Sequence, residues 1–85
     1  MTTAVKFFVY ILECADGRYY TGYTSNLERR MKEHAAGRGC SFTTGFGFSK
    51  LLYSETHSEK SAAMKREAAI KKLSRAKKVA LIQGL

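Results

Sequence analysis

Two tyrosines, an arginine and a glutamate have the types and the order expected of a site that hydrolyses phosphodiesters. Tyr10 and Tyr20 stand ten residues apart in segments rich in aromatic and β-branched residues, and Arg30 follows ten residues later. Glu67 stands much further along the chain, within an apolar helical pattern. Phosphodiester hydrolysis needs an activated water and positive charge at the phosphoryl oxygens. A phenol, a guanidinium and a carboxylate that holds a metal ion can supply both.

The two tyrosines lie in a predicted β-hairpin. Lys6 to Cys14 and Arg18 to Tyr23 both have strand composition, and Asp16-Gly17 between them is a strong turn signal. Side chains alternate between the two faces of a strand, so the length of the connecting loop decides whether the tyrosines share a face.

A two-residue turn at Asp16-Gly17 would send the two tyrosines to opposite faces. A three-residue loop, with Gly17 in the left-handed conformation, places Tyr10 opposite Gly22 and Tyr20 opposite Leu12, all on one face. We predict this three-residue loop with a glycine bulge. The other face then carries apolar side chains suited to packing under helices: Phe7, Val9 and Ile11.

The next segment predicts a helix that carries the arginine. Ser25-Asn26-Leu27-Glu28 has the Ser-x-x-Glu form of a capping box, which predicts a helix over about residues 26–36. With successive residues about 100° apart around the axis, Arg30 and His34 lie on the inward flank and Arg29 points away. We therefore expect Arg30 to face the body of the protein.

The second half of the chain predicts a strand and two helices. Gly37 to Ser49 is glycine-rich and is typical of an irregular segment, and Leu51 to Glu55 predicts a third strand. Thr56-His57-Ser58-Glu59 repeats the capping-box form before a long helix that reaches about Leu73. Ser74 can cap a last helix.

Glu67 falls near the centre of the inward stripe of the long helix, between Ala63 and Ile70. A carboxylate there needs a partner, because burying an unpaired charge costs several kcal/mol. From the residues alone, that partner is Lys71, four positions further on, or Arg30 across the domain, in an ordinary ion pair.

Composition favours a polyanionic partner. The 85 residues suffice for one small domain, residues 1–85, and carry a formal net charge of +8, so nucleic acid is the expected partner. The longest apolar run, Phe7 to Leu12, is too short for a membrane span or a signal peptide. The two cysteines, Cys14 and Cys40, predict reduced thiols in a cytoplasmic protein, and a single disulfide is the alternative.

The motifs also carry a family resemblance. Phe8-Val9-Tyr10, Tyr20-Thr21-Gly22, Arg30, His34 and Glu67 occur in the order and spacing of the GIY-YIG nuclease superfamily, and the chain resembles its small stand-alone bacterial, YhbQ-like group. The resemblance implies an α+β fold in which a three-stranded antiparallel sheet is flanked by helices. The implied element order is β-hairpin, helix, strand, helix and helix.

Three positions depart from the family pattern. Phe8 stands where the name motif has glycine and Thr21 where it has isoleucine, and neither replaces a reacting group. Some relatives carry an asparagine in the last helix, where this chain has Lys77-Lys78-Val79. Any role for that amide is missing here or is filled by another group.

The resemblance implies a metal-dependent DNA endonuclease of low sequence specificity that acts in DNA repair or processing. Glu67 would be the sole protein ligand of Mg²⁺ or Mn²⁺, and Arg30 would contact the scissile phosphate. Tyr10 or Tyr20 would take the proton of the attacking water, and the sequence leaves open which one. His34 would contact phosphate or orient a tyrosine hydroxyl.

The basic C-terminal part predicts a nucleic-acid-binding surface, because residues 60–78 hold eight Lys or Arg and one acid. The expected contacts are Lys71, Lys72, Arg75, Lys77 and Lys78. Branched, nicked or single-stranded DNA is the expected substrate. A non-catalytic or weakly catalytic nucleic-acid-binding accessory module and an RNA-binding α/β domain are the alternatives.

Overall fold

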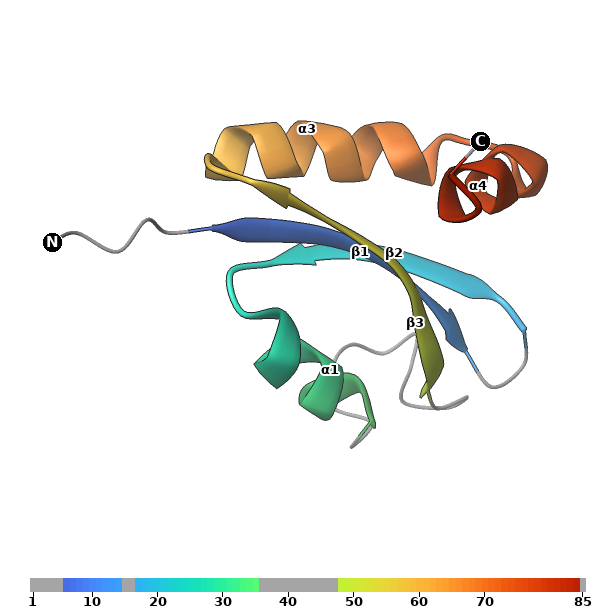
Figure 1. The fold of residues 1–85 in the computed structure, drawn as a ribbon, viewed down its shortest axis with the longest axis horizontal. Coiled ribbons are helices and arrows are strands. Elements are labelled where there is room, and N and C mark those ends of the chain that lie inside the picture. Colours follow the sequence, from blue (N-terminus) through green and yellow to red (C-terminus); the bar gives the residue numbers. More distant parts are fainter. Residues whose placement is uncertain (1–5, 15–16, 36–47, 85) are drawn as a thin grey trace, which may run out of the picture.

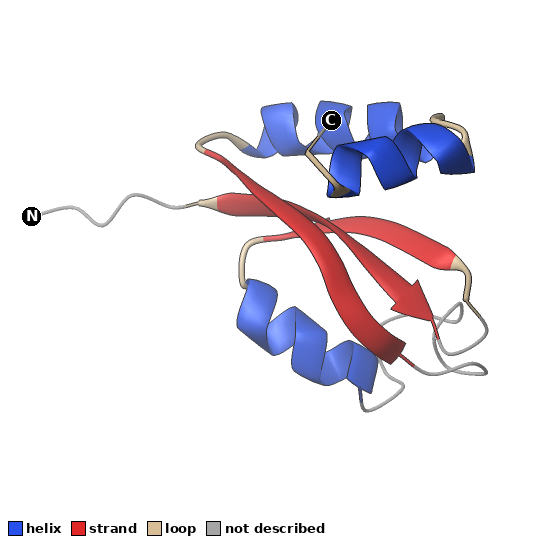
Figure 2. Ribbon diagram, turned by 45° about the vertical axis from the view of Figure 1, so that its right-hand side comes forward, coloured by secondary structure: helices blue, strands red, loops and turns tan. Residues whose placement is uncertain are grey.

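The protein folds as three antiparallel strands between two layers of helix (Figure 2). The computed structural model describes residues 6–14, 17–35 and 48–84. The strands are β1 (Phe7–Cys14), β2 (Tyr19–Thr24) and β3 (Phe48–His57), and the helices are α1 (Leu27–Ala35), α3 (Lys60–Lys71) and α4 (Arg75–Ile82). The strand order β2-β1-β3 leaves β2 at an edge. α1 covers one face of the sheet, and α3 and α4 cover the other (Figure 1). The three-stranded antiparallel sheet flanked by helices, which the resemblance implied, is confirmed.

The hairpin has the predicted register. Tyr10 pairs with Gly22 and Leu12 pairs with Tyr20, so both tyrosines lie on the face that α1 covers. Gly17 has φ +89°, and its N–H donates to the Cys14 carbonyl at 2.9 Å. Residues 15 and 16 lie outside the described residues, but the register on either side of them is that of the three-residue loop and not of the two-residue turn.

Two small apolar clusters hold the layers together, one on each face of β1. Val9 and Ile11 are buried against Ala63 and Ile70 of α3. On the other face, the buried side chains Tyr10, Leu12 and Cys14 pack against partly buried residues that include Leu27 and Met31 of α1. Because β1 contributes to both clusters, it is buried on both faces, as the near-continuous apolar run of its sequence indicates.

The first helix begins one residue later than the capping-box interpretation requires. The side-chain oxygen of Asn26 accepts a hydrogen bond from the Arg29 N–H at 3.0 Å, so Asn26 is the N-cap and α1 begins at Leu27. The Asn26 N–H in turn donates to Thr24 Oγ1 at 3.1 Å. Ser25 as the capping residue was therefore wrong, because the turn at Thr24 places the asparagine amide at the helix end.

The third strand is longer than predicted, and the second capping box was also wrong. β3 spans Phe48–His57, whereas Leu51 to Glu55 was expected, and α3 begins after Glu59, which makes no side-chain cap. Strand pairing accounts for the longer β3, because Thr56 and His57 pair with Phe8 and Phe7 of β1. Residues 37–47 of the predicted irregular segment lie outside the described residues.

The last helices largely follow the prediction. α3 ends at Lys71, slightly before the expected Leu73. The Ser74 hydroxyl accepts a hydrogen bond from the Lys77 N–H at 3.2 Å, which confirms the expected cap of α4. Among the described residues, no helix has the length and apolarity that crossing a bilayer requires.

A partly buried ionic network ties α3 to β3. Arg66 donates from Nε to both Glu55 carboxylate oxygens, at 3.0 and 3.2 Å, and Tyr53 and His57 also hydrogen-bond to Glu55. Burial acts to raise the pKa of Glu55, but the hydrogen bonds from Tyr53, His57 and Arg66 outweigh it and lower that pKa. The charged pair fixes Arg66, and with it the rotation of α3 that turns Glu67 towards the edge of the sheet.

Candidate active site at the edge of β2

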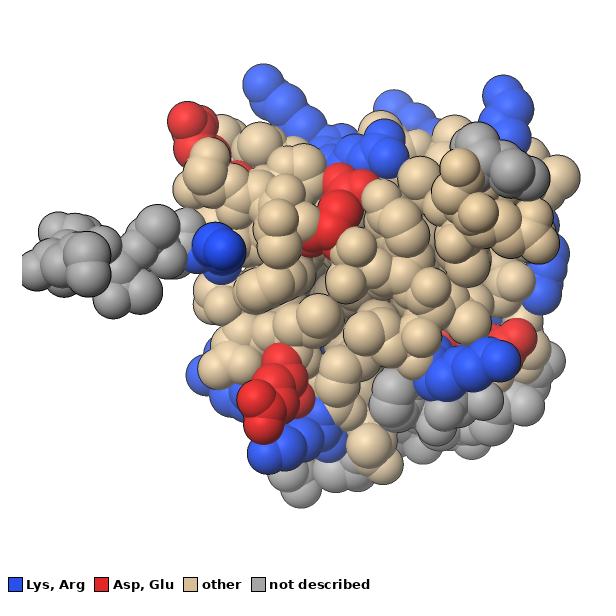
Figure 3. Space-filling model, viewed as in Figure 1, with Lys and Arg blue, Asp and Glu red and all other residues tan. Residues whose placement is uncertain are grey.

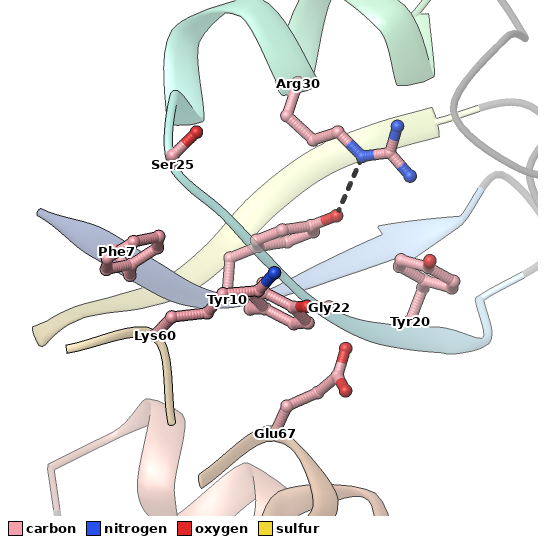
Figure 4. A pocket seen from close by; sticks show the side chains of 9 residues that line it. Phe7, Tyr10, Tyr20, Gly22, Ser25, Arg30, Lys60 and Glu67 are labelled. Atoms are coloured by element: carbon pink, nitrogen blue, oxygen red, sulfur yellow. Dashed lines mark hydrogen bonds between the residues drawn. The ribbon is translucent and has the colours of Figure 1, made fainter. Parts of the chain in front are cut away.

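A cavity of about 440 Å³ lies at the β2 edge and collects side chains from both faces of the sheet (Figure 4). It is lined by Phe7, Tyr10, Tyr20, Gly22, Tyr23, Ser25, Arg30, Lys60 and Glu67. Four of the five residues predicted to form the catalytic group are among them. Tyr10, Tyr20 and Arg30 approach from the α1 side, and Glu67 approaches from α3.

Gly22 makes the opening through which Tyr10 reaches this cavity. Tyr10 is on the central strand, so its side chain must extend across β2 to meet the edge. A Cβ on Gly22 would lie 2.6 Å from the Tyr10 hydroxyl oxygen and 2.8 Å from its Cζ, which is closer than real contacts allow. A glycine opposite Tyr10 is therefore a steric requirement of this arrangement.

Tyr10, His34 and Arg30 form one hydrogen-bonded group. The Tyr10 hydroxyl lies 3.0 Å from His34 Nε2 and accepts a hydrogen bond from Arg30 Nε at 3.4 Å. His34 is 0% exposed and does not line the cavity. It was predicted to contact phosphate or to orient a hydroxyl, and only the second role agrees with this geometry.

The charges in this group are set by burial and by the hydrogen bonds. The hydrogen bond to Tyr10 raises the pKa of Arg30 despite partial burial, and Glu33 adds to the effect through an ion pair at 3.1 Å. Burial lowers the pKa of His34, and the nearby positive charge of Arg30 lowers it further. The group therefore holds a permanent cation beside a neutral imidazole at pH 7.

The rings of Tyr10 and Tyr20 both contact the His34 ring. The Tyr20 ring meets His34 edge to face at 5.2 Å between centroids, and the Tyr10 and Tyr20 centroids are 6.3 Å apart. Aromatic pairs favour such tilted geometries. Tyr10 is 1% exposed, whereas Tyr20 is only partly buried and lies nearer to solvent.

Glu67 contributes a carboxylate to the lining of the cavity. Its side chain is 20% exposed, points into the cavity, and lies 3.7 Å from the Lys71 ammonium (Figure 4). The ion pair with Lys71 and the orientation towards the cavity both occur, so the two interpretations of Glu67 are not exclusive. Arg30 pairs with Glu33 and not with Glu67.

The donors in the cavity fit a hydrated divalent ion better than a fully enclosed one. Within the described part of the chain, no cluster of three or more His, Cys, Asp or Glu is placed to hold a metal. Among the described residues that line the cavity, Glu67 is the single carboxylate. Mg²⁺ is commonly bound by one or two carboxylates and keeps several waters, for which a polar cavity of this size has room.

The predicted basic surface is divided between two places. Lys71 lies beside Glu67, whereas the Arg75 guanidinium stacks on Tyr19, 4.1 Å from the ring centroid, and donates to the Gly17 carbonyl at 3.1 Å. A second cavity, of about 250 Å³, is lined by Arg18, Tyr19, Arg75 and Lys78. Lys72 and Lys77 are exposed. Basic side chains stand out along the α3 and α4 side of the molecule (Figure 3).

Several lining residues were not anticipated from the sequence. Tyr23, Ser25 and Lys60 belong to the cavity, and in the second cavity Arg18 and Tyr19 join the predicted Arg75 and Lys78. The alternation of β2 could have indicated that Tyr19 and Tyr23 share a face. No spacing rule relates Lys60 to Tyr10, because α3 and β1 meet only in the tertiary fold.

Residues 6–80 match the family model described as the GIY-YIG catalytic domain. The chain belongs to the GIY-YIG family. The match includes both tyrosines, the arginine, the histidine and the glutamate discussed above, and it places the protein among nuclease domains.

Relatives of this GIY-YIG domain are small proteins of similar length. It is 52% identical over 79 residues to a UPF0213 protein of Natronomonas pharaonis, with 93% of each chain covered. A UPF0213 protein of Streptococcus sanguinis is 46% identical, covering 92% of this chain and 90% of the relative. The solution NMR structure of a UPF0213 protein from Bacillus halodurans matches with a TM-score of 0.59 at 46% identity, covering 92% of this chain and 83% of that one.

Replacing Gly22 by alanine should destabilise the domain and displace Tyr10. We expect Gly22→Ala to lower the free energy of unfolding by about 1–3 kcal/mol, because the new methyl overlaps the phenol. Urea denaturation measures this change. Ser54→Ala is the control, since Ser54 is the exposed residue opposite Tyr10 on β3, and it should leave the free energy of unfolding nearly unchanged. Equal stability of Gly22→Ala and the parent would contradict the steric argument.

His34 should make stability depend on pH below neutrality. The pKa of buried His34 lies below its unfolded value of 6.5, so the unfolded state binds the proton more readily. The free energy of unfolding should therefore fall as the pH drops below about 6.5, and His34→Gln should flatten this dependence. Urea titrations between about pH 5 and 7.5 test it. Glu55, with its lowered pKa, contributes only at more acidic pH. An unchanged slope in the variant would refute the assignment.

Proposed function

We propose that this GIY-YIG domain is a metal-dependent DNA endonuclease of low sequence specificity that acts in DNA repair or processing. One observation carries the proposal: Tyr10, Tyr20, Arg30 and Glu67 come from four elements and two faces of the sheet, yet all line one cavity. An ordinary packing role for each residue does not require that they meet. A site for phosphodiester hydrolysis does.

Arg30 is proposed to bind the scissile phosphate. Its guanidinium keeps its charge at any physiological pH, and its planar fork matches phosphate oxygens. The hydrogen bond from Nε to Tyr10 and the ion pair with Glu33 hold the side chain over the cavity before any substrate arrives. Such preorganised charge is what stabilises the transition state.

Tyr20 is proposed as the general base, with Tyr10 as a positioning residue. The Tyr10 hydroxyl is almost fully buried and is held between His34 and Arg30, whereas Tyr20 lies nearer to solvent, where an attacking water can reach it. Arg30 favours a phenolate nearby by simple electrostatics. The Tyr20 phenolate takes a proton from water, the water oxygen bonds to phosphorus, and the leaving sugar oxygen departs with its electron pair and takes a proton from solvent.

Glu67 is the proposed metal ligand. A divalent ion such as Mg²⁺ or Mn²⁺, when bound, would supply positive charge at the phosphate. Lys71, at 3.7 Å, balances the carboxylate when no ion is present. With one carboxylate, the affinity for metal should be weak without DNA.

Low sequence specificity and a DNA partner are supported by the surface. The second cavity, with Arg18, Arg75 and Lys78, offers charge for a phosphate backbone, and we propose Lys71, Lys72 and Lys77 as further contacts. No described element beyond the catalytic body is placed to read base edges. Recognition of DNA shape at nicks, branches or single strands suits such a surface.

Glu67→Ala and Arg30→Ala should each reduce cleavage by about 100-fold or more while DNA binding persists. The assay incubates nicked, branched and single-stranded DNA with Mg²⁺ and the purified parent or variant. Glu28→Ala, at an exposed position outside the cavity, is the control. Binding without metal-dependent cutting by the parent would instead support the accessory-module alternative, and full activity in Glu67→Ala would indicate a contaminating nuclease.

Substitutions of the two tyrosines should change different kinetic constants. Tyr20→Phe removes the proposed base, and we expect kcat to fall by roughly 10²- to 10⁴-fold. Tyr10→Phe keeps the ring but loses the contact to Arg30, so it should mainly raise KM. Single-turnover and steady-state cleavage of one nicked duplex measure both effects. A larger loss of kcat in Tyr10→Phe would reverse the assignment.

A further inference from the structure

One end of the active-site cavity is occupied by residues that the proposed reaction does not use. Phe7, Ser25 and Lys60 lie there, away from Tyr20, and the Lys60 side chain extends from the start of α3 into the cavity (Figure 4). The cavity, of about 440 Å³, extends past Arg30 to these residues. This is more space than one phosphate group at Arg30 fills.

Lys60 differs from the other cations of the site in its pairing. Arg30 is paired with Glu33 and Lys71 with Glu67. For Lys60, no carboxylate among the described residues lies within ion-pair distance. Its ammonium therefore adds a net positive charge to this end of the cavity.

Helix stability does not account for a lysine at this position. Lys60 is the first residue of α3, where the partial positive charge of the helix end opposes a cation, and the first turn contains no acidic residue. Residues that break a local preference without a structural gain are concentrated at functional sites. Lys60 lines the cavity, where its charge is available to a ligand.

We propose that Lys60 binds the phosphate next to the scissile one, so that the nucleic-acid strand crosses the cavity from Lys60 to Tyr20. The inference rests on the proposed function, because it assumes that the cavity receives a nucleic-acid strand. An ammonium on a flexible stem suits a non-reacting phosphate, whose position need not be as exact as that held by Arg30. The site then takes two consecutive phosphates of one strand.

Thymidine dinucleotide and trinucleotide test this directly, because they carry one and two bridging phosphates. Binding is measured by NMR titration of the intact protein without divalent metal, so that no cleavage occurs. The parent should bind the trinucleotide about tenfold more tightly than the dinucleotide. In Lys60→Met this advantage should shrink to about the twofold that two equivalent binding registers give, and Lys60→Arg should restore it.

Lys65→Met is the matched control, since Lys65 is an exposed lysine on the same helix that does not line the cavity. It should keep the trinucleotide advantage. The proposal is overturned if the parent binds the two oligonucleotides equally well, or if Lys60→Met keeps the full preference for the trinucleotide. It is also overturned if Lys60→Met and Lys65→Met lose that preference equally, since the loss would then follow from net charge.

The outcome is independent of catalysis. A Lys60 effect in a protein that never cuts DNA would leave the phosphate subsite standing and remove the endonuclease proposal. If the parent cuts DNA but Lys60→Met keeps the preference for the trinucleotide, the endonuclease proposal stands and the phosphate subsite is removed.

Discussion

The close pairing of Tyr10 with Gly22 is the constraint on which the rest of the site depends. A central strand is normally screened from solvent by its neighbours, and a phenol on β1 has to reach across β2 to the edge. The missing Cβ at Gly22 leaves that path open, since a methyl there would lie 2.6 Å from the hydroxyl. A register shifted by one residue would place Gly22 elsewhere and turn Tyr20 to the opposite face.

The sheet edge lets two helices on opposite faces act on one cavity. α1 supplies the guanidinium and α3 the carboxylate, and a site in the middle of either face could not receive both. The partly buried pair of Glu55 and Arg66 ties α3 to β3, the strand at the opposite edge of the sheet. Such a pair, with side chains 18% and 39% exposed, contributes little net stability, but other rotations of the helix would separate its charges. It therefore acts on the site through the orientation of Glu67.

Electrostatics divides the cavity into two functional parts. Around Tyr10, a neutral histidine and a permanent cation meet at one hydroxyl, and burial keeps the histidine uncharged. Around Glu67, the charge is balanced by a weakly held and half-exposed Lys71, so that a cation can exchange for it. The first part is held by hydrogen bonds between buried and partly buried groups, whereas the second is held by one long ion pair to a half-exposed lysine.

Local sequence patterns determined the elements, the hairpin register and the inward direction of Arg30, because strand alternation, helical periodicity and the turn glycine are short-range rules. These patterns failed at helix ends. Asn26 caps α1 in place of Ser25, and pairing with β1 extends β3 into the second predicted capping box. Only the tertiary structure decided that Glu67 shares a cavity with the tyrosines, that His34 is held behind Tyr10, and that Lys60 joins them. These contacts cross between elements, and their geometry depends on packing angles that no local pattern encodes.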